Sequence, residues 1–378
     1  MTIAIITNTS WNIWNFRMGL AQALQSAGYK VIAIAPKDDF THKIIAKGIP
    51  HYPINMENRG SNPLKDLKLL WDFYRIYQKT SPDLLLQFTI KPNIYGTMAA
   101  KLLKIPVINN VSGLGTTFLH KGFVSNTARL LYKFAFRHTN KVFFQNNDDR
   151  QLFIRYKLIE ETKTGLVPGS GINLHMFQYT PPTPNDSFTF LAAARLLYDK
   201  GIEEYAMAAQ LLRNKGIKAT FKLAGAIDKN PKLGIPEKKI EEWHSKGVIE
   251  YIGFKEQLNE EMSKADCIVL PSYREGTPRT LLEAAAIGRP IITTDVPGCR
   301  ETVVEHKNGL LCKRKDVADL AEKMETMLNL SFDKVMEMGI ESRALVERKF
   351  DERIVVERYL SEIENIDIGK PRIPEAGK

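Results

Sequence analysis

Long hydrophobic runs are missing from this sequence. No uninterrupted apolar stretch in its 378 residues approaches the roughly 20 that a helix needs to cross a bilayer. The first ten residues, MTIAIITNTS, have neither a basic n-region nor a long apolar h-region, so they predict a first β-strand rather than a signal peptide. These absences argue against a membrane-spanning or secreted protein, and we expect a cytoplasmic one.

Cysteine is scarce, and recognisable metal-binding patterns are missing. The three cysteines, Cys267, Cys299 and Cys312, are far apart, which is typical of reduced core residues in a cytosolic protein. The seven histidines show no metal-ligand spacing, and the chain contains no Asp-x-Asp, so we predict no metal site. A G-x-G-x-x-G motif is also absent after the first predicted strand, where TNTSWN stands, and this disfavours a Rossmann oxidoreductase.

Charge is plentiful but unevenly distributed. The net charge is +10, and residues 1–175 hold 22 Lys and Arg against 10 Asp and Glu, so this half alone carries +12. The rest of the chain is close to neutral. A basic first half suggests an anionic partner such as a membrane or a nucleic acid. A solvated basic surface without a partner explains the charge equally well.

Strand-like apolar runs alternate with helical stretches along the whole chain. This rhythm predicts parallel sheets with right-handed crossovers. The proline-rich segment QYTPPTPNDS separates two such series. We therefore predict an α/β fold with two Rossmann-like doubly wound domains that face each other across a cleft. The predicted domains are residues 1–175, residues 176–350, and a final segment 351–378 that forms a helix packing back on the first domain and a disordered tail.

The segment REGTPRTLLE contains two glutamates eight positions apart, Glu275 and Glu283. Pro278 suits the first turn of a helix, and Gly288 suits its end. Apolar strands are predicted on both sides, so Glu275 lies in the loop before the helix, where ligands bind in a parallel sheet. Amide groups at this helix start suit an anion, and the glutamates suit sugar hydroxyls. The pattern fits a ligand with phosphate in the middle and sugars at the ends.

A second motif, AARLLYDKG, places Arg195 and Lys200 after the first strand of the second domain. Two cations beside a helix start can bind a diphosphate. Ordinary loop charges would explain either residue alone. The combination with Glu275 and Glu283 on a neighbouring strand end favours the diphosphate site.

These motifs together resemble the family 4 retaining glycosyltransferases of the GT-B fold. Besides R-x4-K and E-x7-E, the resemblance includes GSGIN (169–173) and VPG (296–298). It implies that Arg195 and Lys200 neutralise the departing diphosphate of a UDP-sugar, that Glu283 holds the ribose, and that Glu275 lies near the donor sugar. It implies no metal and no cofactor. Further donor contacts are assigned to Gly225, Phe254, Gly276, Thr277, Thr280 and Leu281.

The loop after the fourth strand departs from many of these relatives because it lacks their histidine. Its sequence, QFTIKPNIYG, instead resembles bacterial enzymes that act on undecaprenyl-diphosphate-linked sugars. This resemblance makes the first domain the acceptor-binding one, with Arg17, Lys91 and Asn93 as candidate contacts. It implies transfer of an N-acetylhexosamine from a UDP-sugar to a polyprenyl-diphosphate-linked saccharide in bacterial glycan assembly.

A membrane contact is predicted for residues 117–141, which are basic and apolar together. Arg129, Lys133 and Arg137 form a stripe beside Leu130 and Phe134, which suits anionic lipid. The resulting location is peripheral, on the inner face of the cell membrane. A core-packing helix with a solvated edge is the alternative.

Two other functions compete with this prediction. A GT-B nucleotide-sugar epimerase would need acid–base carboxylates in the cleft and would release free product, and the first domain offers no strong candidate. A non-enzymatic basic module that binds membrane or nucleic acid would not need Arg195, Lys200 and the E-x7-E pattern. We therefore expect an enzyme and no nucleic-acid partner.

Overall fold

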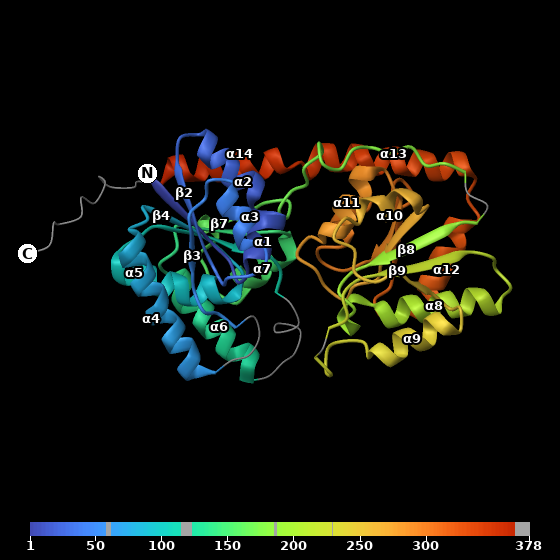
Figure 1. Cartoon of the computed structure of the whole chain (residues 1–378), viewed down its shortest axis with the longest axis horizontal. Helices are drawn as coiled ribbons and strands as arrows, with labels where there is room; N and C mark the ends of the chain where they lie inside the picture. The colour runs from blue at the N-terminus through green and yellow to red at the C-terminus, as the bar shows by residue number, and fades with distance from the viewer. Residues whose placement is uncertain (58–61, 115–122, 185–186, 229, 367–378) are drawn as a thin grey trace, which may run out of the picture. The chain divides into compact units, whose positions relative to one another are not determined.

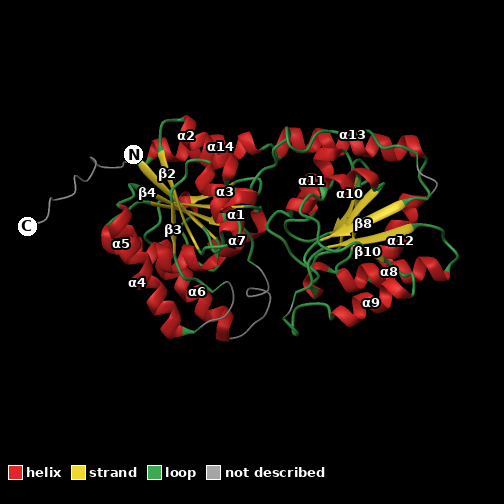
Figure 2. Cartoon of the chain, viewed as in Figure 1, coloured by secondary structure: helices red, strands yellow, loops and turns green. Residues whose placement is uncertain are grey.

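A computed structural model describes residues 1–57, 62–114, 123–184, 187–228 and 230–366 of the chain. These residues form two compact units (Figure 1). Unit 1 consists of Met1–Ser170 and the segment that begins at Glu352, and unit 2 is Gly171–Asp351. Each unit contains a parallel sheet with helices packed on both of its faces (Figure 2). The predicted α/β class with two Rossmann-like units is confirmed.

The sheet of unit 1 has seven strands in the order β3-β2-β1-β4-β5-β6-β7. All neighbouring strands are parallel. The chain leaves β1 first toward one edge and then toward the other, so the topological switch point lies between β1 and β4. The strands are β1 (Thr2–Ile6), β2 (Lys30–Ala35), β3 (His51–Pro53), β4 (Leu84–Phe88), β5 (Val107–Val111), β6 (Lys141–Phe144) and β7 (Thr164–Leu166).

The helices of unit 1 cover both faces of this sheet because consecutive strand residues, which point to opposite faces, are apolar. Ile3 and Ile5 pack with α2 and α14, whereas Ala4 and Ile6 pack with α4 and α5 on the other face. The helices are α1 (Ser10–Phe16), α2 (Met18–Ser26), α3 (Thr41–Ala46), α4 (Pro63–Thr80), the π-helical η1 (Pro92–Gly96), α5 (Thr97–Leu103), α6 (Phe123–Phe136), α7 (Asn147–Arg155), the 3-10 helix η3 (Glu161–Lys163) and α14 (Glu352–Asn365).

The sheet of unit 2 has six parallel strands in the order β10-β9-β8-β11-β12-β13, so its switch point lies between β8 and β11. The strands are β8 (Thr189–Ala193), β9 (Thr220–Ala224), β10 (Glu250–Tyr251), β11 (Cys267–Leu270), β12 (Ile291–Thr294) and β13 (Gly309–Cys312). The helices are η4 (Tyr198–Lys200), α8 (Ile202–Asn214), α9 (Glu237–Ser245), α10 (Asn259–Lys264), α11 (Arg279–Ile287), η5 (Arg300–Thr302), α12 (Val317–Leu328) and α13 (Phe332–Lys349).

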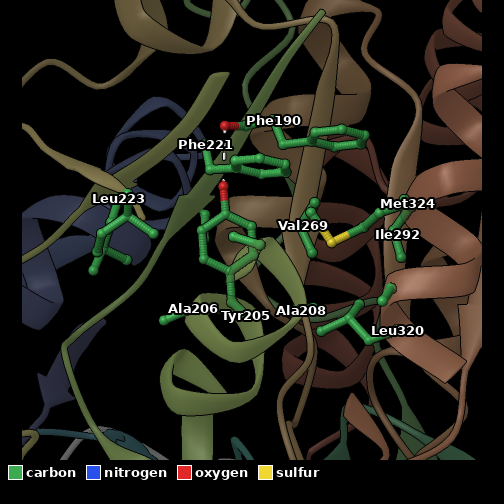
Figure 3. Close-up of a cluster of buried hydrophobic side chains, with 14 of the residues drawn as sticks. Phe190, Tyr205, Ala206, Ala208, Phe221, Leu223, Val269, Ile292, Leu320 and Met324 are labelled. Carbon is green, nitrogen blue, oxygen red and sulfur yellow. Dashed lines mark hydrogen bonds between the residues drawn. The ribbon is translucent and has the colours of Figure 1, made fainter. Parts of the chain in front are cut away.

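An aromatic cluster fixes α8 on the sheet of unit 2 (Figure 3). Phe190 of β8 stacks on Phe221 of β9 with 5.7 Å between ring centroids. Tyr205 of α8 lies against them, and its buried hydroxyl donates to the carbonyl oxygens of Phe190 and Lys222 at 3.1 and 3.0 Å. The phenol thus satisfies its polar atom inside an apolar core, and it fixes α8 against β8 and β9.

In the described part of the chain, no helix combines the length and apolar character needed to span a membrane.

Candidate active site

The loops after β8 and β11 lie at the switch point of unit 2, where parallel α/β sheets bind ligands. Arg195 and Lys200 follow β8, and the segment Ser272–Glu275 follows β11. The two loops are joined by backbone, because the amide of Tyr273 donates to the carbonyl of Asp199 at 2.8 Å. The structure thus brings the two motifs to one place, as the sequence predicts.

An ion pair between Lys200 and Glu275 forms the centre of this arrangement. Both side chains are largely shielded, with 18% and 14% of their surfaces exposed. The Ser272 hydroxyl donates to the same Glu275 oxygen at 2.8 Å, so the carboxylate is fixed from two sides. The pairing orients an ammonium group that has three donors and can still bind an additional anion. Sequence patterns did not single out Ser272, although it belongs to the predicted strand-end segment.

Arg195 lies beside this pair in the chain but differs from Lys200 in its surroundings. Its side chain is exposed, and no hydrogen bond or ion pair of its guanidinium group occurs within the residues that the structure describes. An exposed guanidinium at a strand end is suited to bidentate contact with a phosphate. A role in donor binding stays a prediction.

Glycines let the loops at this sheet edge approach one another. A Cβ at Gly201 would stand 2.1 Å from the Pro271 carbonyl oxygen, and one at Gly298 would stand 2.4 Å from that of Glu275. Both glycines also have positive φ, +71° and +86°. Gly225, a predicted donor contact, packs against the Ala194 carbonyl, where an added Cβ would fall at 1.8 Å. The loops after β8, β9, β11 and β12 therefore meet only because these positions lack side chains.

Helix α11 begins and ends as predicted. Pro278 is its N-cap, and Gly288 adopts the left-handed conformation at its C-cap. Inside the helix, Glu283 pairs with Nε of Arg279 at 3.1 Å. Burial raises the pKa of the Glu283 carboxyl, and the neighbouring Arg279 opposes this shift. Arg279 also donates to the carbonyl of Gly171 at 3.1 Å, which ties α11 to the first residue of unit 2.

The remaining predicted donor contacts lie around these loops with differing exposure. Leu281 is fully buried and Gly276 is buried, whereas Thr277 and Thr280 are half-buried at the start of α11. The Phe254 side chain follows β10 and is 65% exposed. The buried Leu281 side chain packs in the core of unit 2, so only its backbone is placed to contact a ligand.

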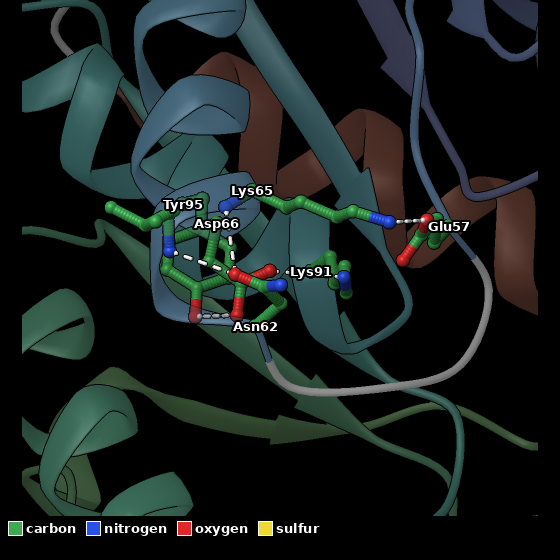
Figure 4. Close-up of polar contacts among 7 residues, drawn as sticks. Glu57, Asn62, Lys65, Asp66, Lys91 and Tyr95 are labelled. Atoms are coloured by element: carbon green, nitrogen blue, oxygen red, sulfur yellow. Dashed lines mark hydrogen bonds and ion pairs between the residues drawn. The ribbon is translucent and has the colours of Figure 1, made fainter.

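The three candidate acceptor contacts lie in unit 1 and have partners there. Arg17 is 3% exposed, and its guanidinium lies 4.0 Å from the centroid of the Phe88 ring. Lys91 pairs with Asp66 at 3.0 Å (Figure 4). Asn93 is 1% exposed and donates to the carbonyl of Asn110 at 2.8 Å. Direct contact of these side chains with an acceptor stays a prediction.

Arg17 interrupts the helical segment that follows β1. Helices α1 and α2 are separated at this residue, whose φ is −129°. The interruption accompanies the burial of its guanidinium over Phe88.

Two polar atoms at the switch point of unit 1 were not predicted. Thr89 follows β4 with a φ of +70°, which is a strained conformation for a β-branched residue. Its Oγ1 is buried and has no hydrogen-bond partner in the described part of the chain. The same is true of Oδ1 of Asn12, which lies in α1 after the neighbouring strand β1. Backbone strain and unmet hydrogen bonding at a strand end have no direct signature in sequence.

The predicted membrane stretch is only partly described, since residues 115–122 lie outside the described ranges. Within α6, Leu130 and Phe134 are 68% and 47% exposed, and Lys133 is exposed beside them. Arg137, which follows the helix, is exposed too. Arg129 instead places its guanidinium 4.0 Å from the centroid of the Tyr156 ring. The basic stripe predicted from the spacing is thus reduced to two outward-facing members.

A metal site in a protein needs several His, Cys, Asp or Glu side chains close together. Among the described residues, no group of three or more of these side chains is placed to hold a metal ion. The three cysteines are buried and unbridged, as predicted. Burial raises the pKa of Cys299 to about 12, so this thiol stays protonated at neutral pH.

Comparison with known proteins identifies the class that this fold and site define. Residues 179–344 match the family described as "Glycosyl transferases group 1", and residues 2–146 match "Glycosyl transferase 4-like". A glycosyltransferase from Rickettsia africae has a solved structure with a TM-score of 0.80 and 18% identity, covering 98% of this chain and 99% of its own.

Two curated relatives extend the comparison. The N,N'-diacetylbacillosaminyl-diphospho-undecaprenol α-1,3-N-acetylgalactosaminyltransferase of Campylobacter jejuni is 30% identical, covering 95% of this chain and 97% of its own length. The UDP-Gal:α-D-GlcNAc-diphosphoundecaprenol α-1,3-galactosyltransferase of Escherichia coli is 22% identical, covering 84% of this chain and 87% of its own. The chain belongs to the group 1 glycosyltransferases of the GT-B fold.

Proposed function

We propose that the chain is a retaining, metal-independent family 4 glycosyltransferase. In this proposal it moves an N-acetylhexosamine from a UDP-sugar to a polyprenyl-diphosphate-linked saccharide during bacterial glycan assembly. The observation that carries the reaction is the Lys200–Glu275 pair beside Arg195 at the switch point of unit 2. The choice of substrates is supported by the names of the Campylobacter and Escherichia relatives, which both act on undecaprenyl-diphosphate-linked sugars.

The donor diphosphate is proposed to bind at the end of β8. Arg195 and Lys200 would donate to its oxygens, while Glu275 keeps the ammonium group oriented through the ion pair seen in the structure. Glu275 would accept a hydrogen bond from a donor-sugar hydroxyl, and Glu283 would accept one from the ribose. When the bond between the sugar C1 and the diphosphate breaks, the negative charge that develops on UDP would be stabilised by the two cations, which lowers the barrier.

The acceptor hydroxyl is proposed to attack C1 from the same face that UDP leaves. Its oxygen forms the new bond to C1, and its proton passes to the oxygen of the departing phosphate. No side-chain base is required, which suits a site whose named carboxylates are assigned to hydroxyl binding.

The protein is proposed to work at the inner face of the cell membrane, where lipid-linked saccharides would be available to it. The exposed Leu130, Phe134 and Lys133 of α6 support a contact with anionic lipid.

UDP is expected to bind in the presence of excess EDTA, and transfer should proceed under the same conditions. The reason is that two side-chain cations replace the divalent ion that otherwise neutralises a diphosphate. Isothermal calorimetry with UDP, with and without EDTA, measures this. Binding that appears only after Mn²⁺ or Mg²⁺ is added would show that the diphosphate needs a metal. Failure to bind under either condition would favour a non-enzymatic module.

A further inference from the structure

Helix α4 exposes a stripe of large apolar side chains that do not belong to the core of unit 1. Leu64, Leu67 and Trp71 are 80%, 65% and 48% exposed. Their spacing of three and four residues places them on one side of the helix. The opposite side of the helix supplies Leu69 and Phe73 to the core of unit 1, so α4 already covers the sheet with other apolar side chains. A contiguous apolar stripe on an outward face is typical of an interaction surface.

Basic side chains lie directly beside this stripe. Lys68, Arg75 and Lys79 of α4 line a groove of about 400 Å³ together with the end of β3 and the residues after it, and Asp72 is the one acidic residue in the lining. The guanidinium of Arg75 lies 5.4 Å from the centroid of the Trp71 ring, so cationic and apolar groups are interleaved. We name Leu64, Leu67, Trp71, Lys68, Arg75 and Lys79 together the α4 face.

The α4 face is presented by a helix whose start is firmly held (Figure 4). Asn62 caps the helix by accepting from the amides of Leu64 and Lys65. In the first turn, the carboxylate of Asp66 accepts from Lys91 at 3.0 Å and from the hydroxyl of Tyr95 at 2.9 Å. These contacts fix α4 against η1, and they give Lys91 a structural task independent of any acceptor. The apolar stripe is therefore displayed in a defined orientation.

The neighbouring helices continue the same outward surface. Helices α4, α5 and α6 pack side by side on one face of the unit 1 sheet. Leu102, just before the end of α5, is 60% exposed, and α6 adds the exposed Leu130 and Phe134. A layer of three helices with exposed apolar side chains and adjacent lysines suits a flat anionic surface better than a small ligand.

We propose that the α4 face docks on an anionic phospholipid bilayer. Leu64, Leu67 and Trp71 would enter the interfacial zone, where tryptophan is favoured. Lys68, Arg75 and Lys79 would contact the headgroup phosphates. Because the α4 face mixes cations with apolar groups, it favours a bilayer over an acidic protein surface as the partner. This inference rests on the proposed function, because it supplies the membrane contact that transfer to a lipid-linked acceptor requires.

Tryptophan fluorescence with brominated lipids tests the docking directly. The full chain is mixed with vesicles of phosphatidylcholine that contain or lack phosphatidylglycerol, with bromines on the acyl chains. We expect quenching and a blue shift with the anionic vesicles. Trp71→Phe should retain vesicle binding but lose most of the quenching, because the other tryptophans, Trp11, Trp14 and Trp243, lie on other elements. Equal quenching in Trp71→Phe would overturn the proposal.

Co-sedimentation with the same vesicles separates the contributions of the α4 face. Lys68→Gln/Arg75→Gln/Lys79→Gln should lower partitioning about 100-fold at low salt, since each basic residue near the surface contributes about 1 kcal/mol. Leu64→Gln/Leu67→Gln should lower partitioning at least about tenfold at every salt concentration. The variant Lys133→Gln/Arg137→Gln tests α6 and the residue that follows it, and its effect should stay below the roughly 30-fold that two charges at the membrane surface would give. Vesicle partitioning that is unchanged in both α4 variants would contradict the proposal. Variants that lose self-association but keep their binding to vesicles would contradict it as well.

Calorimetry with UDP keeps this test distinct from the proposed reaction. All α4 variants should bind UDP with wild-type affinity, because the donor residues lie in unit 2. Vesicle binding without UDP binding in the wild type would refute the reaction and leave the membrane contact standing. UDP binding and transfer to a water-soluble acceptor without vesicle binding would refute only the membrane contact.

Discussion

Replacing Lys200 with alanine is expected to lower kcat/KM for transfer about 100-fold, and Arg195→Ala about tenfold. A charge-assisted hydrogen bond to a phosphate contributes roughly 1.5–3 kcal/mol, which corresponds to these factors. Lys200 should matter more because its removal also leaves the Glu275 carboxylate, which is only 14% exposed, without its cation. The diphosphate would then meet a negative charge in place of a positive one.

The comparison that isolates this effect uses another lysine of unit 2. Lys215 also forms an ion pair, with Glu325, but follows α8 at the far end of the helix from Lys200. Lys215→Ala should keep wild-type kinetics, because an exposed pair contributes little to stability and nothing to the donor site. Steady-state kinetics with a UDP-sugar give the values, and circular dichroism checks the folding of each variant. Wild-type kcat/KM in Lys200→Ala and Arg195→Ala would remove both from the donor site.

Gly298→Ala is expected to destabilise unit 2 and to abolish most transfer. The new Cβ would stand 2.4 and 2.5 Å from the carbonyl oxygens of Glu275 and Gly276, so the loop that carries Glu275 must move. Its φ of +86° adds about 1–2 kcal/mol of conformational cost for an alanine, and the steric displacement adds roughly 1–3 kcal/mol. Because the loop carries the carboxylate that orients Lys200, catalysis should fall together with stability.

Gly216→Ala provides the matched control for this substitution. Gly216 has a similar φ of +77°, but nothing lies within 4 Å of the position where its Cβ would be. The control should show the conformational cost alone and keep wild-type kcat/KM. Thermal denaturation and transfer kinetics of the two variants measure the difference. Equal stability and equal activity of the two variants would mean that the loop after β12 does not constrain the loop that carries Glu275.

Much of the fold could be predicted because its signals are local. Apolar runs bounded by turn residues predict the strands, and Pro278 and Gly288 mark the limits of α11 through their own backbone preferences. In a parallel sheet the carboxyl ends of all strands lie at one edge, so Arg195 and Glu275 could be expected at that edge. Residue types at strand ends thus indicated where the candidate site lies.

The interactions within the site depend on distances that sequence spacing does not contain. Lys200 and Glu275 are 75 positions apart, and their pairing requires the close approach that Gly201 and Gly298 permit. Lys91 is a candidate acceptor contact in the sequence, yet its partner Asp66 lies 25 positions earlier on α4. The exposure of Leu64, Leu67 and Trp71 likewise depends on which side of α4 the sheet occupies.

Product analysis tests the central claim most directly. The protein is incubated in excess EDTA with a panel of UDP-sugars and short polyprenyl-diphosphate-linked saccharides, and products are read by mass spectrometry and NMR. The account predicts that a UDP-N-acetylhexosamine extends the lipid-linked saccharide by one residue, with the anomeric configuration of the donor retained. A product of inverted configuration would contradict the proposed mechanism, and release of a free or epimerised sugar without extension of any acceptor would contradict the proposed function.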